Sequence, residues 1–165
     1  MSRFRFILIF LAILVISCQK DEAPQSFLSG TYETKQEIQG RGSWYFNQFR
    51  FQADGTFEQT SFLRESEVGE RIGFTYYSRG KYTLNGIDFT LIETQIKDTG
   101  FNEALLPVVN ITELTERELL PEGLESIGIL RVLNRGNSFT LRMGCNPEIG
   151  ICNMLNRTLT YNKID

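Results

Sequence analysis

The sequence predicts an all-β protein built as an antiparallel sandwich or barrel. Nearly every segment after Leu28 alternates apolar with polar residues or is rich in β-branched and aromatic side chains. Aromatic residues make up 12% of the chain, with 13 Phe and 6 Tyr, and turn signals recur at short intervals. No window of about 11 or more residues has a convincing helical period. The 165 residues suit one domain preceded by a tail.

The first 17 residues are interpreted as a secretory signal peptide. Arg3 and Arg5 precede Phe6–Ile16, an unbroken apolar run of 11 residues. A membrane-spanning helix needs about 20 apolar residues, so this run is too short to be one. The order of positive charge, apolar run and small residue is that of a signal. We therefore predict a signal peptide at 1–17, a tether at 18–28 and a folded domain at 29–165.

Val15-Ile16-Ser17-Cys18 resembles the lipobox of bacterial lipoproteins. The resemblance implies cleavage before Cys18 and a diacylglycerol on its sulfur, which with further acyl groups anchors a protein stably. Gln19-Lys20-Asp21-Glu22 is similar to the acidic tetrapeptide that sends Bacteroidetes lipoproteins to the outer face of the outer membrane. The expected location is thus the cell surface, with the membrane as partner through the N-terminal lipid. The alternative is a secreted protein with a free thiol at Cys18.

Two further cysteines, Cys145 and Cys152, are expected to form a disulfide. Leftover thiols outside the cytoplasm usually pair, and the loop between them carries Pro and Gly turn signals. Closing so short a loop stabilises the fold by about 2.5 kcal/mol in the chain-entropy picture. A redox or metal pair is the alternative, but the chain has no His to complete a metal site.

Two hairpins are predicted from which residues each register sets opposite one another. A two-residue turn at Asn85-Gly86 pairs Tyr82 with Phe89 and Gly80 with Leu91. A three-residue loop at Ala53-Asp54-Gly55, with Gly55 left-handed, pairs Phe51 with Phe57, Arg50 with Glu58 and Tyr45 with Leu63.

A third hairpin leaves two registers open. A two-residue turn at Gly136-Asn137 pairs Val132 with Leu141 but opposes Arg131 to Arg142, so a four-residue loop from Asn134 is the alternative. Other strands are expected at Gly30–Ile38, Val108–Leu114, Ser138–Met143 and Leu155–Ile164. Lys97–Pro107 is expected to be a loop, and Thr115–Ser126 to hold either a helical turn or a short strand at 118–120.

Several short motifs together resemble the lipocalin-like domains of Bacteroidetes lipoproteins. They are Leu28-Ser29-Gly30-Thr31-Tyr32, Phe49-x-Phe51-x-x-Asp54-Gly55-Thr56-Phe57, Gly80-Lys81-Tyr82-x-Leu84 and Ile111-x-x-Leu114-Thr115. The resemblance implies an antiparallel up-and-down β-barrel of about eight strands. Lipocalins place a Trp on the first strand under an Arg from near the last one; here Tyr32 stands for the Trp, and Arg157 is the Arg candidate.

The first functional hypothesis is a barrel that binds a small apolar ligand. A barrel of about eight strands leaves room for one such molecule, and ligand sites are mostly apolar with a few placed polar groups. The predicted ligand-binding residues are Tyr45, Phe49, Phe51, Phe57, Tyr76, Tyr82, Phe89 and Glu93, with Leu91 also facing inward. Polar candidates of the same inward parity are Asn47, Gln59, Ser61 and Ser78. The alternative for the aromatic residues is a packed core.

The second hypothesis is a surface module that binds another protein. Trp44, Phe46, Phe62 and Tyr77 fall on the outer face of their strands, where exposed aromatics mark interfaces. They are equally compatible with burial under the N-terminal segment or a helix.

Catalysis is the weakest hypothesis. The absence of His removes triad and His-base chemistry, and we predict no catalytic residues, cofactor or metal. Glu65, Glu67 and Glu70 cluster in a predicted loop, where solvated carboxylates are usual, so Glu93 is the one carboxylate worth testing. The net charge of −3 disfavours nucleic acid as a partner.

Overall fold

The computed structural model describes residues 28–100, 106–144 and 157–165. Cys18, Cys145 and Cys152 lie outside these ranges, so the lipid attachment and the disulfide remain predictions. Among the described residues, no helix is long and apolar enough to cross a membrane. The strands are β1 (Gly30–Glu37), β2 (Trp44–Phe51), β3 (Thr56–Arg64), β4 (Arg71–Asn85), β5 (Asp88–Asp98), β6 (Thr115–Glu116), β7 (Leu124–Leu133), β8 (Ser138–Met143) and β9 (Leu159–Lys163).

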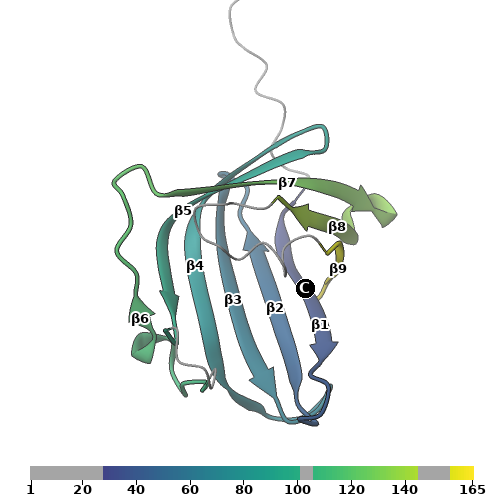
Figure 1. The fold of residues 1–165 in the computed structure, drawn as a ribbon. Coiled ribbons are helices and arrows are strands. Elements are labelled where there is room, and N and C mark those ends of the chain that lie inside the picture. The colour runs from purple at the N-terminus through teal and green to yellow at the C-terminus, as the bar shows by residue number, and fades with distance from the viewer. Residues whose placement is uncertain (1–27, 101–105, 145–156) are drawn as a thin grey trace, which may run out of the picture.

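Eight of these strands close into an antiparallel barrel. Each pairs with its neighbour in the order β1, β2, β3, β4, β5, β7, β8 and β9, and β9 returns to pair with β1. The short β6 pairs with the last two residues of β5 beside the barrel (Figure 1). The predicted up-and-down barrel of about eight strands is confirmed. Closure leaves no free strand edge around the ring.

The two ends of the barrel differ. At the end that we call the plugged end lie Leu28, the C-terminal Asp165 and the loops 52–55, 86–87 and 134–137. The Tyr32 hydroxyl donates to the Gly136 carbonyl there over 2.8 Å, and the Tyr82 hydroxyl lies 3.4 Å from the Leu28 carbonyl. At the opposite end, which we call the mouth, lie the loops 38–43 and 65–70 and the two residues after β5, Thr99 and Gly100.

Hairpin registers test the sequence predictions directly. Gly55 has a φ of 81°, and Phe51 pairs with Phe57, so the three-residue loop is confirmed. The β7–β8 connection is the four-residue alternative, with Val132 opposite Phe139 rather than Leu141. The two-residue turn at Asn85-Gly86 is wrong by one position, because Asn85 pairs with Asp88 and the turn is Gly86-Ile87.

The error at this turn has a clear cause. Gly86 has a φ of 64°, and a glycine at the first turn position is what a type II′ turn requires. The shift sets Tyr82 opposite Leu91 instead of Phe89. When the turn moves by one residue, each residue of β4 pairs with a residue two positions further along β5. Because side chains alternate with a period of two, every side chain stays on its predicted face.

Two further expectations are corrected. Val108–Leu114 is not a strand: Val108 forms a single bridge with Phe74, and Ile111–Glu113 is a 3-10 turn. The strand expected at 118–120 lies instead at Thr115–Glu116. Near Tyr32 the cation is not Arg157, which donates to Gln36 over 3.2 Å, but Lys163, whose Nζ lies 5.9 Å from the Tyr32 ring centroid.

The segment 106–114 covers a second apolar cluster on the outside of the barrel. Phe46, Phe62, Phe74 and Leu114 are buried there, with Trp44 and Tyr77 packed against them. Phe46 and Phe62 stack at 5.2 Å and an interplanar angle of 4°. The hypothesis that Phe46 and Phe62 form an exposed interface is therefore wrong, since this segment shields them from water.

Candidate functional site

The half of the barrel interior toward the plugged end is filled by side chains. We call this set the plug: Leu28, Tyr32, Phe49, Phe51, Phe57, Tyr82, Phe89, Leu91, Leu130, Phe139, Leu141 and Tyr161. The Phe51 ring alone contacts five other rings, with centroid distances from 4.8 Å to Tyr82 up to 6.1 Å to Tyr32 and Phe89. These are the offset and edge-on geometries that aromatic groups prefer in cores. Five of the predicted ligand-binding residues (Phe49, Phe51, Phe57, Tyr82 and Phe89) belong to the plug.

The interior toward the mouth mixes polar with apolar side chains, since the buried Leu63 and Ile96 face inward opposite Tyr45 and Ser78. We call it the mouth half and define it by the inward-facing residues Tyr45, Asn47, Gln59, Ser61, Tyr76, Ser78 and Glu93. Tyr161 Oη donates to Asn47 Oδ1 over 2.9 Å, and Asn47 Nδ2 donates to Ser61 Oγ over 2.8 Å. This chain of hydrogen bonds marks the boundary where the plug ends. Burial raises the pKa of Tyr161 above its ordinary value.

Solvent reaches the mouth half. Tyr45 faces the interior, because its hydroxyl donates to the buried Ser61 Oγ over 2.8 Å, yet 36% of its surface is exposed. Gln59 and Tyr76 are only half-buried although they also face inward. An inward side chain that touches water shows that the interior is accessible from the mouth.

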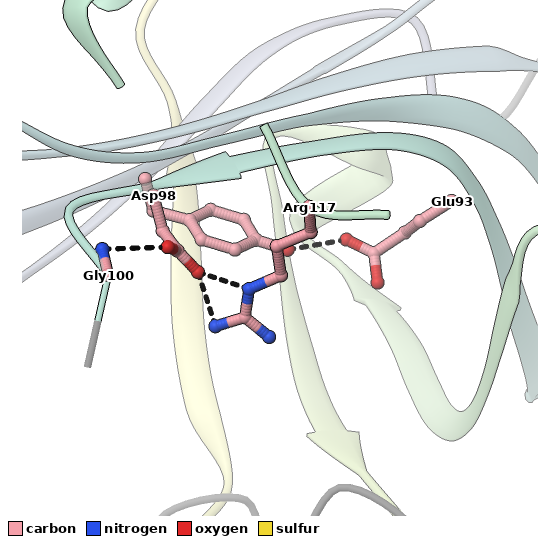
Figure 2. A network of polar contacts seen from close by, with 5 residues as sticks. Glu93, Asp98, Gly100 and Arg117 are labelled. Carbon is pink, nitrogen blue, oxygen red and sulfur yellow. Dashed lines mark hydrogen bonds and ion pairs between the residues drawn. The ribbon is translucent and has the colours of Figure 1, made fainter. Parts of the chain in front are cut away.

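Glu93 is the buried carboxylate of the mouth half. It is 6% exposed, and its Oε1 accepts a 2.6 Å hydrogen bond from the Tyr76 hydroxyl (Figure 2). Burial raises the pKa of Tyr76, and the negative charge of Glu93 raises it further. The nearby Ser78 hydroxyl and the Arg117 guanidinium oppose this rise in the Tyr76 pKa. Tyr76 thus keeps its proton and donates it in the hydrogen bond that holds the Glu93 carboxylate in place.

An ion pair stands beside this hydrogen bond. Arg117 Nε and Nη2 both contact Asp98 Oδ2, and the Gly100 backbone N–H donates to Asp98 Oδ1 over 2.8 Å (Figure 2). Arg117 follows β6 directly, and its N–H donates to the Ile96 carbonyl over 2.9 Å. The pairing of β6 with β5 therefore brings Arg117 to the mouth half.

Gly80 sets the position of Glu93. Gly80 pairs with Glu93 while Arg79 pairs with Gln95, so β5 bulges at Thr94. A Cβ on Gly80 would lie 1.9 Å from the Ile92 carbonyl oxygen, a distance that no side chain tolerates. Glycine is needed here because the two backbones approach this closely.

Sequence reasoning placed Tyr45, Tyr76 and Glu93 on the inner face, and the structure brings all three to the mouth half. It missed Asp98 and Arg117. Arg117 lies in a segment with no clear periodic pattern, and only the long-range pairing of β6 with β5 carries it inward. No local signal in the sequence would have found it.

Comparisons with known proteins add no family or relative. A scan against models of protein families finds no match to this chain, and a search of curated proteins finds no matching sequence. Within residues 28–100, 106–144 and 157–165, no group of three acidic or Cys side chains is placed to hold a metal ion.

Proposed function

We propose that this protein is a lipid-anchored protein of the outer-membrane surface whose barrel binds one small molecule in the mouth half. Support for binding comes from the closed eight-stranded barrel, a size of barrel that either fills with side chains or holds one small ligand. Support for the anchor and location comes from the lipobox-like Val15–Cys18 and the acidic tetrapeptide after it. No catalytic role is part of the proposal.

The observation that carries the proposal is the contrast between the two halves of the interior. A barrel that serves only as a scaffold can be filled with apolar side chains throughout, as the plug is. The mouth half instead combines the solvent-exposed ring of Tyr45 with the hydroxyl of Tyr76 and the buried carboxylate of Glu93. Apolar surface with a few fixed polar groups is typical of a small-molecule site.

The alternative, a surface module for another protein, has less support. Of the four aromatic residues that suggested it, Phe46 and Phe62 are buried beneath the segment 106–114, and Trp44 and Tyr77 are partly buried against them. We therefore favour ligand binding.

A pair of neighbouring substitutions on β3 tests ligand binding. Gln59 faces the interior opposite Phe49, and Thr60 faces outward opposite Gln48. We expect native mass spectrometry of the protein released from its own membranes to show a bound small molecule that denaturation removes. Gln59→Trp fills the mouth half and abolishes this extra mass, whereas Thr60→Trp adds the same ring outside and preserves it. Bare protein mass in the wild type, or equal retention by both variants, would overturn the proposal.

The anchor is tested separately. Cys18→Ser removes the sulfur that would take the lipid, so we expect the variant to leave the membrane fraction and to lose incorporation of a labelled fatty acid. Protease treatment of intact cells should cleave the wild type if it faces outward. Continued membrane association of Cys18→Ser would contradict the anchor without touching the binding proposal.

A further inference from the structure

Glu93 is a buried carboxylate of which, among the described residues, only one oxygen accepts a hydrogen bond. Oε1 accepts from Tyr76, but within the described part of the chain Oε2 has no hydrogen bond and neither oxygen has an ion-pair partner. Burying an ionised carboxylate costs free energy unless a cation or several donors compensate it. One phenolic hydroxyl supplies a single donor.

The charges around Glu93 leave its own uncompensated. Asp98 and Arg117 also reach the mouth half, and they pair with each other through two guanidinium nitrogens. In Figure 2 the guanidinium of Arg117 is turned to Asp98 and not to Glu93. This described set therefore has one net negative charge, which complements a cation.

Ser78 supplies a second, independent observation. It is 0% exposed, and among the described residues its Oγ meets no partner at hydrogen-bonding distance and angle, although it lies near enough to the Tyr76 hydroxyl to lower the pKa of that group. Ser78 lies on β4 between Tyr76 and Gly80, and Gly80 is the residue paired with Glu93. A buried hydroxyl without a partner is rare in native proteins, since leaving it unpaired costs about 1–3 kcal/mol. A ligand donor that reaches this position would relieve the cost.

From these contacts we infer that the ligand carries a positively charged head group of the protonated-amine class, received by Glu93 and Ser78, on an apolar body. An ammonium has three donors, enough for Glu93 Oε2, Ser78 Oγ and one water. The half-buried ring of Tyr76 offers a face that also attracts cations. A carboxylate ligand is disfavoured because the Arg117 guanidinium already binds Asp98. The inference rests on the proposed function and names its ligand class.

Three probes of equal chain length test the head group: n-octylamine, n-octanol and n-octanoate. Each is titrated into the purified full-length protein by calorimetry, with wild type, Glu93→Gln and Glu37→Gln compared. Glu93→Gln keeps the shape of the side chain and removes its charge. Glu37→Gln is the matched control, because Glu37 lies at the same end of the barrel but pairs with Trp44 on the outer face. Thermal unfolding confirms that all three proteins are folded.

We expect octylamine to bind at least about tenfold more tightly than octanol and octanoate, since a charge-assisted hydrogen bond is worth roughly that factor. Glu93→Gln should remove this preference, Ser78→Ala should reduce it, and Glu37→Gln should leave it unchanged. Equal binding of all three probes, or a preference that survives Glu93→Gln, would overturn the amine inference while leaving a binding barrel in place. Failure of all three probes to bind would also overturn the amine inference. Native mass spectrometry of the protein released from its membranes would then test the proposed function independently.

Discussion

The Tyr76 hydroxyl donates to Glu93 Oε1 over 2.6 Å on the inner face of the barrel, between the neighbouring strands β4 and β5. The two residues are not opposite each other in the sheet, since Tyr76 pairs with Asp98 and Glu93 with Gly80. The bulge at Thr94 and the length of the tyrosine side chain bring their polar ends together. This hydrogen bond fixes the orientation of the carboxylate that we assign to the ligand.

The coupling of Tyr76 and Glu93 is measurable. Tyr76→Phe should lower the free energy of unfolding by about 1–3 kcal/mol, because it leaves a buried carboxylate without its donor. In the Glu93→Gln background the same change should cost less, so a double-mutant cycle by urea unfolding should give a coupling of about 1–2 kcal/mol. Strictly additive effects would show that the hydrogen bond does not form in solution.

Raised tyrosine pKa values predict loss of stability at high pH. Burial raises the pKa of Tyr161 above its ordinary 10.0, so in the folded protein the ring keeps its proton at a pH where the unfolded chain releases it. The stability from this effect is complete below pH 10 and is lost as pH rises above it, by about 1.4 kcal/mol per pH unit for each such tyrosine.

Urea unfolding between pH 9 and pH 11 checks this dependence. Tyr161→Phe has no phenolic proton to lose. Above pH 10 its free energy of unfolding should therefore fall less steeply than that of the wild type, by about 1.4 kcal/mol per pH unit. Tyrosinate absorbance of the wild type should rise together with unfolding. Equal slopes for the two proteins would contradict the burial of the Tyr161 hydroxyl.

The plug should account for much of the stability. Phe51 touches five rings, so Phe51→Ala should lower the free energy of unfolding by about 3–5 kcal/mol. Ile127 is an apolar residue of β7 that faces solvent, and Ile127→Ala should change stability by no more than about 0.5 kcal/mol. Similar costs for the two variants would mean that the plug is loosely packed.

Two substitutions in the segment 106–114 test whether it covers the outer apolar cluster. Leu114 is buried against Phe46 and Phe62, whereas Val109 is exposed. We expect Leu114→Ala to cost about 2–4 kcal/mol and to increase binding of a hydrophobic dye, while Val109→Ala has little effect on either. No change in stability and dye binding with Leu114→Ala would show that the segment does not pack there in solution.

Most of the barrel could be predicted from the sequence, because turns and the alternation of inward and outward side chains are specified by residues close together in the chain. Gly55 specifies a left-handed loop position, and inward parity along β2 and β3 follows from that one register. The displaced turn at Gly86 shows the limit of such reasoning: two turns one residue apart put the same side chains on the same face, so pairing by polarity cannot separate them.

The parts that the sequence did not predict depend on long-range contacts. Nothing near Phe46 and Phe62 indicates that residues 106–114 cover them, because the joining contact is the bridge between Phe74 and Val108. Alternation of apolar and polar residues also does not predict the division of the interior into plug and mouth half. Phe49 and Tyr45 both face inward on β2, yet Phe49 lies in the plug and Tyr45 is partly exposed to solvent. Depth along the barrel, not strand face, separates the two.

A crystal structure of the protein purified from its own cells tests ligand binding in the mouth half most directly. We predict electron density for a small molecule between the rings of Tyr45 and Tyr76, with a donor atom within hydrogen-bond distance of Glu93. Density that lies among the plug rings or on the outer surface, or a mouth half that holds only water, would contradict it.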